Sequence, residues 1–207
     1  MNESSALVFI VDDDEAVRNS LRLLLKSVGL GTAVFATAQQ FLDAYRPSQP
    51  GCLVLDVRMP GMSGMELQQQ LNLRGAVIPV IFISGHGDIP MAVAAIQQGA
   101  FDFLQKPFRD QDLIDRIQRA LIKDQGDRAQ LEERARTRER LVSLTPRERQ
   151  VLELVILGKP NKVMAGDLGV SQRTVEIHRA RVMEKMDASS LAQLVRMMLD
   201  ERSGAPA

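Results

Sequence analysis

The sequence predicts an α/β domain with a doubly wound, parallel (βα)5 sheet, joined by a helical linker to an all-α domain of four helices. Over the first 120 residues, five short apolar runs alternate with segments of helical period. Such βα repeats form parallel sheets with helices on both faces. After residue 142 only short helical segments follow. We therefore expect the α/β domain over residues 1–122, the linker over 123–142 and the helical domain over 143–207.

The expected strands are the apolar runs, each of which is too short for a helix. They cover residues 7–11, 32–35, 53–57, 80–84 and 101–104. The first helix is expected over residues 15–28, before a glycine. Thr37 and Ser63 mark further helix starts, because each is followed three residues later by Gln or Glu in the spacing of a capping box.

From residue 111 onward the strand pattern gives way to one long helical pattern. Its apolar positions are Leu113, Ile117 and Leu121, and a stretch rich in Arg and Glu follows them. The spacing of these charges suits a helix that lies mostly in water. Gly126 is a point where this helix could be interrupted, and a disordered charged linker stays open as the alternative.

Four helices are expected in the last domain. Thr145, Pro146 and Glu148 supply a capping side chain, a proline at the first helical position and a glutamate at the third. Together these three residues mark a helix start. That helix should end at Gly158. The other three helices are expected to begin after Asn161, after Ser171 and near residues 189–190.

The composition excludes several classes of protein. Hydrophobic residues make up 45% of the chain and charged residues 25%, which is typical of a globular protein. No apolar stretch is long enough to span a bilayer, and the N-terminus lacks the basic region of a signal peptide. We therefore expect a cytoplasmic protein with no membrane partner. A mild excess of basic residues in the last domain permits DNA binding without establishing it.

Polar side chains suited to phosphate chemistry follow the predicted strands, where ligands bind in an open parallel sheet. They are Asp12, Asp13 and Asp14 after the first strand, Asp56 after the third, Ser84 at the fourth and Lys106 after the fifth. Crowded carboxylates repel one another, so a cation should neutralise them. Oxygen ligands without Cys or His favour a hard ion such as Mg²⁺, with Mn²⁺ as an alternative.

This set of residues suits the transfer of a phosphoryl group to an aspartate. With a metal ion and an ammonium group nearby, one carboxylate can attack phosphorus and carry the group as an acyl phosphate. Ser84 and Lys106 would then contact the phosphoryl oxygens. A single aspartate after a strand often only caps the next helix, and Asp14 can have that role alone.

Residues 9–108 resemble the receiver domain of the response-regulator family. The motifs that carry the resemblance are, in order, Val11-Asp12-Asp13, the stretch from Leu55 to Gly64, Ser84-Gly85-His86 and Lys106-Pro107-Phe108. The resemblance implies a (βα)5 fold in which a sensor histidine kinase phosphorylates Asp56. It also implies a cis peptide bond between Lys106 and Pro107.

The same resemblance implies roles for the residues around the phosphoacceptor. The residues implied for Mg²⁺ binding are Asp12 (through water), Asp13, Asp56 and the backbone carbonyl of Arg58. Ser84 would be the switch hydroxyl that is drawn toward the phosphoryl group. Phe103 would be an aromatic switch that turns inward, with a core position as the alternative. The surface changed by this switch would include the helix at residues 89–98.

Two short helices in the last domain, joined by a turn at Gly169-Val170-Ser171, fit a helix-turn-helix, whose second helix enters the major groove of DNA. On that helix Val175, Val182 and Met186 share one face and should pack inward. The candidates for contact with base edges are Glu176, Ile177, Ala180 and Arg181. The candidates for contact with DNA phosphates are Lys162, Arg173, Thr174, Arg179 and Lys185.

Residues 144–152, 161–162 and 173–179 resemble the LuxR-type helix-turn-helix of the FixJ and NarL group. Together the two resemblances imply a response regulator and transcription factor that is not an enzyme, apart from self-phosphorylation and self-dephosphorylation. Phosphorylation would promote a homodimer that binds a two-fold promoter site and activates transcription with RNA polymerase. One module of this size offers too few DNA contacts alone.

Two other functions stay open from the sequence. A phosphatase of the haloacid-dehalogenase type would need a threonine that residues 12–16 lack. A constitutive DNA-binding protein would use a non-phosphorylated receiver only for dimerisation. Two positions in the last domain also have alternatives. The last helix, with Leu191, Leu194, Val195 and Met198, is either a dimer surface or part of the core, and His178 is expected to pack against the core.

Overall fold

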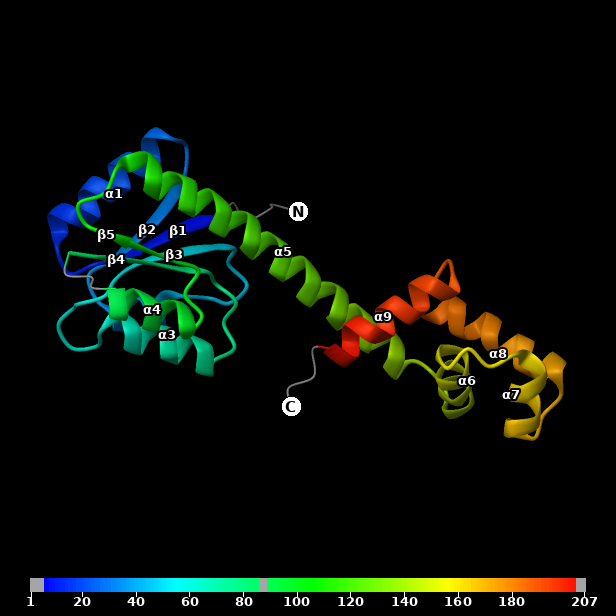
Figure 1. The fold of residues 1–207 in the computed structure, drawn as a ribbon. Helices are drawn as coiled ribbons and strands as arrows, with labels where there is room; N and C mark the ends of the chain where they lie inside the picture. The colour runs from blue at the N-terminus through cyan, green and yellow to red at the C-terminus, as the bar shows by residue number, and fades with distance from the viewer. Residues whose placement is uncertain (1–5, 86–88, 204–207) are drawn as a thin grey trace. The chain divides into compact units, whose positions relative to one another are not determined.

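The computed structural model describes residues 6–85 and 89–203, and the side chains as far as Glu201. The chain divides into two compact units (Figure 1), and the boundary along the chain falls between Arg128 and Ala129. The first unit contains a parallel sheet covered by helices, and the second is helical. The predicted fold class is therefore confirmed. None of the helices in the described parts of the chain is long and apolar enough to cross a bilayer.

Five parallel strands form the sheet of the first unit in the order β2-β1-β3-β4-β5. Their bounds are Leu7–Val11 (β1), Gly31–Phe35 (β2), Gly51–Asp56 (β3), Val80–Ser84 (β4) and Asp102–Gln105 (β5). The chain order reverses at β1, which lies between β2 and β3. The carboxyl ends of β1 and β3 therefore lie side by side at the switch point where such sheets bind ligands.

Helices cover both faces of this sheet (Figure 1). Their bounds are Glu15–Ser27 (α1), Ala38–Ala44 (α2), Gly64–Leu73 (α3), Ile89–Gln97 (α4) and Asp110–Val142 (α5). On one face, Leu25 of α1 and Ile117 of α5 are fully buried in the core. On the other face, Phe41 of α2 and Leu67 of α3 are fully buried in a second core cluster. Apolar residues thus hold the sheet between two helical layers.

Two strands begin earlier than the apolar pattern predicts, because glycines extend them. In the parallel register Leu7 pairs with both Gly31 and Gly51. A side-chain Cβ at Gly51 would collide with the backbone carbonyl of Leu7. Strand pairing is set by backbone hydrogen bonds, whereas the apolar pattern reports only side-chain burial. A glycine at a strand end therefore escapes the pattern.

Helix caps largely follow the predicted spacing. Ser63 and Glu66 form a complete capping box, in which each side chain accepts a hydrogen bond from the backbone of the other. Thr37 accepts a bond from the backbone of Gln40, as expected. The Gln40 side chain, however, accepts from Ala36, one residue before the cap. The second half of that capping box is therefore displaced by one residue.

Helix α5 is one continuous helix of 33 residues that passes through Gly126 without a break. The interruption considered at Gly126 is therefore not found, and the segment expected as a linker is helical. In the part of α5 that belongs to the first unit, Asp124 is only 1% exposed. It accepts hydrogen bonds from the Gly51 backbone at 2.9 Å and from Arg128 Nε at 2.7 Å. These bonds fasten α5 to the start of β3.

The second unit packs four further helices around its own core. Their bounds are Pro146–Ile156 (α6), Asn161–Leu168 (α7), Gln172–Lys185 (α8) and Leu191–Ser203 (α9). Gly169 ends α7 in the left-handed conformation, with φ 64°, which glycine adopts at little cost. On α9, Leu194 is fully buried whereas Leu191 is exposed. The inner face of α9 thus belongs to the core, and its outer face is open.

Candidate functional site

The ends of three strands bring two buried carboxylates onto one ammonium group. Asp12 follows β1 and is 1% exposed, and Asp56 ends β3 and is 8% exposed. Lys106 follows β5, and its Nζ lies 2.7 Å from Asp12 Oδ2 and 2.9 Å from Asp56 Oδ1. The three residues are far apart in the sequence, so it is the parallel strand order that brings them together. The peptide bond from Lys106 to Pro107 is cis.

The second oxygen of each carboxylate is held by the backbone. Asp12 Oδ1 accepts from the amide of Asp14 at 2.9 Å, and Asp56 Oδ2 accepts from the amide of Arg58 at 2.7 Å. Burial raises the pKa of Asp12, although the bonds from Lys106 and Asp14 oppose this shift. For Lys106, burial lowers the pKa, but the bonds to the two carboxylates outweigh it and the pKa is raised. The ammonium group therefore stays charged.

Two further predicted residues lie on the neighbouring strands. Ser84 ends β4 and is buried, and the residue before it, Ile83, pairs with Asp56 in the sheet. Phe103 on β5 is partly buried against the core cluster of α2 and α3, with its ring centroid 6.5 Å from that of Phe82. His86, which belongs to the motif of Ser84, lies outside the described residues.

The aspartates in the loop after β1 differ in their surroundings. Asp14 caps α1 by accepting bonds from the amides of Ala16 and Val17, and Asp13 is exposed to solvent. Among residues 6–85 and 89–201, no three Asp, Glu, His or Cys side chains converge closely enough to hold an ion as they stand. The donors nevertheless fit a hard cation, because Asp12 and Asp56 share a single ammonium and one negative charge is left uncompensated.

Two residues that support this site were missed by sequence reasoning. Arg18 of α1 donates from Nη1 to the backbone carbonyl of Asp12 at 2.7 Å, which fixes the acidic loop. No sequence pattern singles this arginine out. Gly64 begins α3, and a Cβ there would collide with the backbone carbonyl of Asp56. The glycine in the motif that ends at Gly64 was the available signal, because close backbone approach requires a residue without a side chain.

Helix α8 of the second unit carries the predicted DNA-binding residues. Val175, Val182 and Met186 are buried, as their spacing predicts. The opposite face exposes Ile177, Ala180 and Arg181 to solvent.

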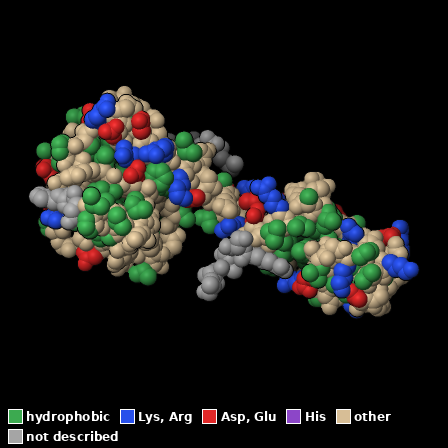
Figure 2. Space-filling view, in the orientation of Figure 1, with side chains coloured by type: hydrophobic (Ala, Val, Ile, Leu, Met, Phe, Trp, Pro, Cys, Tyr) green, Lys and Arg blue, Asp and Glu red, His purple; other side chains and the backbone are tan. Residues whose placement is uncertain are grey.

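Ser171 caps the helix by accepting from the Thr174 amide at 3.1 Å. Figure 2 shows Lys and Arg side chains on the surface of the second unit around α7 and α8. Of the other predicted residues, Lys162 on α7 and Arg173 on α8 are exposed, and Glu176 on α8 is partly buried.

Two of the predicted phosphate contacts are bound within the unit. Arg179 Nη1 donates to Asn161 Oδ1 at 2.7 Å, which ties α8 to α7. Lys185 Nζ donates to Glu148 Oε2 at 2.7 Å, which ties α8 to α6. Glu148 is only 2% exposed. The bond from Lys185, together with the cap bond from the Thr145 amide, lowers the pKa of Glu148 to about 2.

His178 is partly buried on α8, and its Nδ1 has no hydrogen-bond partner in the described part of the chain. This position agrees with packing against the domain rather than exposure to a base edge. Its neighbour Ile177 is exposed. Both positions agree with the sequence expectation, in which Ile177 faces outward and His178 packs against the core.

Both halves of the chain match known families. Residues 8–118 match the response regulator receiver domain, and residues 142–198 match the luxR family of bacterial regulatory proteins. The chain belongs to the response-regulator family. As a response regulator of the FixJ and NarL type, it combines a receiver domain with a LuxR-type DNA-binding domain. The relatives that match along most of the chain are described as transcriptional regulatory or response regulator proteins.

Individual response regulators resemble the whole chain. It is 50% identical over 192 residues to the transcriptional regulatory protein FixJ of Azorhizobium caulinodans, covering 93% of this chain and 91% of that protein. It is 46% identical over 197 residues to the response regulator protein TodT of Pseudomonas putida, covering 95% and 87%. The solved structure of the response regulator StyR matches with a TM-score of 0.83 at 48% identity, covering 94% and 98%.

Proposed function

We propose that a sensor histidine kinase phosphorylates Asp56 in the presence of Mg²⁺, and that phosphorylation promotes dimerisation and sequence-specific binding to promoter DNA. The bound dimer would activate transcription together with RNA polymerase in the cytoplasm. The observation that carries this proposal is the Lys106 ammonium, which lies within 3 Å of carboxylate oxygens of both Asp12 and Asp56. We assign reception of the phosphoryl group to residues 1–122, a linker to 123–142 and DNA binding to 143–207.

The transfer step follows from the position of the Asp56 carboxylate. One of its oxygens attacks the phosphorus atom of the kinase phosphohistidine, the bond from phosphorus to nitrogen breaks, and the imidazole leaves. The product carries about two negative charges. Lys106, already within hydrogen-bonding distance of Asp56 Oδ1, can move to a phosphoryl oxygen. The hydroxyl of Ser84 at the end of the adjacent strand can donate to another.

The residues that would hold Mg²⁺ are Asp13, Asp56 and the carbonyl of Arg58, with Asp12 acting through water. The ion supplies positive charge that stabilises the phosphoryl oxygens during transfer, and Mn²⁺ would serve in its place. Asp12 and Asp56 are buried, which strengthens their attraction for a cation. Arg18 restrains the carbonyl of Asp12, so the acidic loop is already ordered for this role.

Dimerisation is supported by an apolar surface on the first unit. Helix α4 exposes Ile89, Val93 and Ile96 to solvent, and exposed apolar patches mark interaction sites. Phe103 on β5 packs against the same core cluster as α4. Movement of Ser84 toward a phosphoryl group and of Phe103 into the core would change this surface. We therefore assign the dimer contact to the face of α4 and β5.

In the DNA complex, α8 would lie in the major groove. Glu176, Ile177, Ala180 and Arg181 would contact base edges, and Lys162, Arg173 and Thr174 would contact phosphates. Arg179 and Lys185 are also assigned to phosphates, but a phosphate would have to compete with Asn161 for the first and with Glu148 for the second. Their loss should therefore affect folding as well as binding.

A phosphotransfer assay tests the proposal. Wild-type protein should take up labelled phosphate from a phosphorylated histidine kinase when Mg²⁺ is present, and Asp56→Asn should not. Asp14→Asn is the matched control, because Asp14 lies in the acidic loop but caps α1, and it should retain uptake. Labelling of Asp56→Asn at the wild-type level would overturn the assignment.

The switch itself is tested with beryllofluoride and Mg²⁺, which imitate the phosphoryl group. The oligomeric state and the affinity for promoter DNA should both rise. If neither changes and Asp56→Ala still activates the promoter, the protein is a constitutive DNA-binding protein instead.

A further inference from the structure

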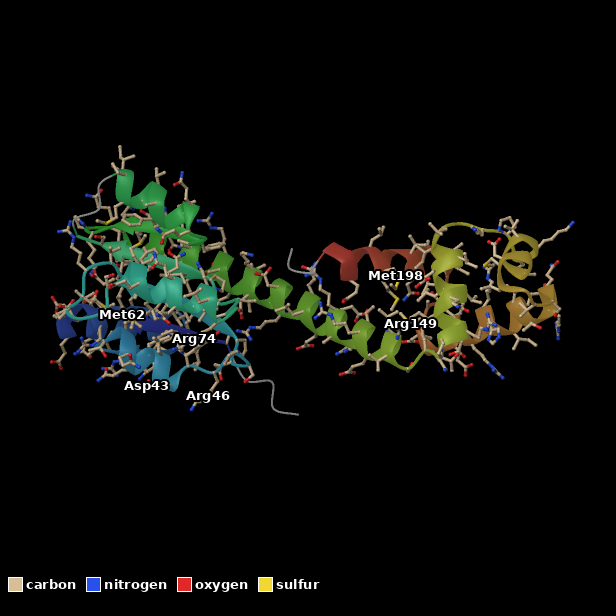
Figure 3. The ribbon with its side chains drawn as sticks, turned by 90° about the horizontal axis from the view of Figure 1, so that it is seen from below. Asp43, Arg46, Met62, Arg74, Arg149 and Met198 are labelled. Atoms are coloured by element: carbon tan, nitrogen blue, oxygen red, sulfur yellow. The ribbon has the colours of Figure 1, made fainter. Side chains whose placement is uncertain are left out.

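Arg18 reaches from the first turn of α1 back to the acidic loop. Its backbone amide donates to the carbonyl of Asp14, the cap of the helix. Long side chains in a helix point toward its amino end, and Arg18 Nη1 donates in this direction to the backbone carbonyl of Asp12 at 2.7 Å. In Figure 3 the labelled Met62, in the loop between β3 and α3, marks this end of the sheet, and Arg74 marks the opposite end.

The carbonyl that Arg18 holds belongs to the peptide plane between Asp12 and Asp13. Because the peptide group is planar, the position of this carbonyl also fixes the direction in which the chain enters Asp13. The other bonds of Asp12 act elsewhere, since its amide donates to β2 and its carboxylate accepts from the Asp14 amide and from Lys106. Arg18 is therefore the residue that restrains the plane leading to Asp13.

The charge and the hydrogen bond of Arg18 have opposite effects on a cation in the acidic loop. The positive charge repels the cation, whereas the hydrogen bond holds the backbone of Asp13 in place. Asp13 is exposed to solvent, so without this bond more of the loop would have to be ordered when an ion binds. Arg18 is itself partly exposed, and water weakens the repulsion. The ordering effect should therefore be the larger one.

We propose that Arg18 sets the affinity for Mg²⁺ by holding the peptide plane between Asp12 and Asp13. This role rests on the function proposed above, in which Asp13 and Asp56 bind the ion. Arg18 is a positioning residue, because its bond goes to a backbone carbonyl and not to a carboxylate of the site. Loss of a group that holds a metal ligand in place typically weakens metal binding by about ten- to a hundredfold.

Binding of Mg²⁺ to the full-length protein is measured from the backbone amide NMR signals of Asp13 and Asp14. Arg18→Ala should raise the dissociation constant about tenfold. Arg22→Ala is the matched control, because Arg22 lies one turn later in α1, is exposed and donates to Asn19 instead of the acidic loop. The control removes the same charge and should leave the dissociation constant unchanged.

Two further replacements of Arg18 separate its donor from its packing. Arg18→Met keeps an unbranched apolar stem but has no donor, so it should weaken binding as much as Arg18→Ala. It therefore decides the test even if Arg18→Ala fails to fold. Arg18→Lys keeps a donor and the charge on a shorter stem, and it should recover part of the affinity.

Phosphorylation by acetyl phosphate separates ion binding from the transfer step. The donor is small, and Asp56 attacks its phosphorus with acetate as the leaving group, so no docking of a kinase is involved. In Arg18→Ala the Mg²⁺ concentration that gives half the maximal rate should rise about tenfold. The rate should approach that of the wild type as Mg²⁺ saturates.

Weaker binding in Arg18→Ala and Arg18→Met, with Arg22→Ala unchanged, supports the proposal. An unchanged dissociation constant overturns it, and a lower one overturns it by showing that the repulsion by Arg18 dominates. An equal loss of rate at every Mg²⁺ concentration also overturns it, because Arg18 would then act on the transfer step. If these results occur in a protein that still binds Mg²⁺ and accepts phosphate, only the role of Arg18 fails. Absence of both activities in the wild type overturns the proposed function itself.

Discussion

Arg128 Nε donates a hydrogen bond of 2.7 Å to Asp124 Oδ2, one turn earlier in α5. The same arginine donates to the backbone carbonyls of Pro47 and Gln49, and the same carboxylate accepts from the amide of Gly51. The pair thus fastens the last turns of α5 in the first unit to the segment that precedes and begins β3. When one member of a buried ion pair is removed, the other is left uncompensated.

Replacing Asp124 by alanine should therefore destabilise the first unit. We expect the free energy of unfolding to fall by about 3 kcal/mol, because Arg128 and the Gly51 amide both lose their acceptor. The measurement is urea denaturation followed by circular dichroism. Asp127→Ala is the matched control, because Asp127 forms the same i,i+4 pair with Lys123 on the surface of the same helix. Asp127→Ala should lower the free energy of unfolding by less than about 1 kcal/mol. Equal losses for the two variants would contradict the anchoring role of Asp124.

Alanine replacements at two glycines should change the free energy of unfolding in opposite directions. A Cβ at Gly64 would collide with the Asp56 carbonyl, whereas Gly126 has open space within helix α5. Gly64→Ala should lower the free energy of unfolding by about 2 kcal/mol or more, and it should slow phosphorylation of Asp56. Gly126→Ala should raise the free energy of unfolding by about 0.5–1 kcal/mol. Thermal unfolding of both variants checks the signs, and stabilisation by Gly64→Ala would show that α3 can shift away from β3.

The second unit should lose stability in acid through Glu148. Its pKa in the folded state is about 2, against an ordinary value of 4.5. A depressed pKa stabilises the folded state above the ordinary value, and this contribution is lost as the pH falls from 4.5 toward 2. Glu148→Gln should therefore be less stable than the wild type at pH 7, by about 2 kcal/mol for a bond to a charged partner. The difference should shrink below pH 4.5.

Glu66→Gln provides the control for Glu148. Glu66 closes the same type of capping box with Ser63 in the first unit, but it is exposed and has no lysine bonded to it in the structure as described. Glu66→Gln should lower the free energy of unfolding by less than half as much as Glu148→Gln. Melting temperatures of both variants at pH 7, 5 and 3.5 test this comparison. An effect of Glu148→Gln that does not depend on pH would mean that packing, not charge, holds α6 to α8.

Arg181→Ala should weaken sequence-specific DNA binding without affecting the fold. Arg181 is exposed on α8, and loss of a base contact costs about 1–3 kcal/mol at the contacted position. The measurement is fluorescence anisotropy at fixed salt, with an operator selected from a random DNA library and a scrambled duplex. Arg196→Ala removes the same charge from the exposed face of α9 and should leave discrimination unchanged. Equal weakening on both duplexes would make Arg181 a phosphate contact instead.

Much of the fold could be predicted because short stretches of the sequence determine where strands and helices form. Short apolar runs marked the strands, and cap spacing marked α3 and α6. Asp56 and Lys106 were predicted to meet because the carboxyl ends of parallel strands share one edge of the sheet.

The features that sequence reasoning missed depend on what packs against each side chain. Asp124 and Arg128 have the spacing of an ordinary surface pair, and only their burial against the segment before β3 gives them a structural role. Lys185 has the spacing of a DNA contact, but α6 brings Glu148 beside it. Neither environment can be read from a pattern within a single helix.

The ammonium group of Lys106 gives the idle regulator a counter-ion of its own. It offsets part of the charge of the two buried aspartates. The charge balance at the centre of the sheet therefore depends on the segment after β5, the last strand in the chain and one that lies at the edge of the sheet.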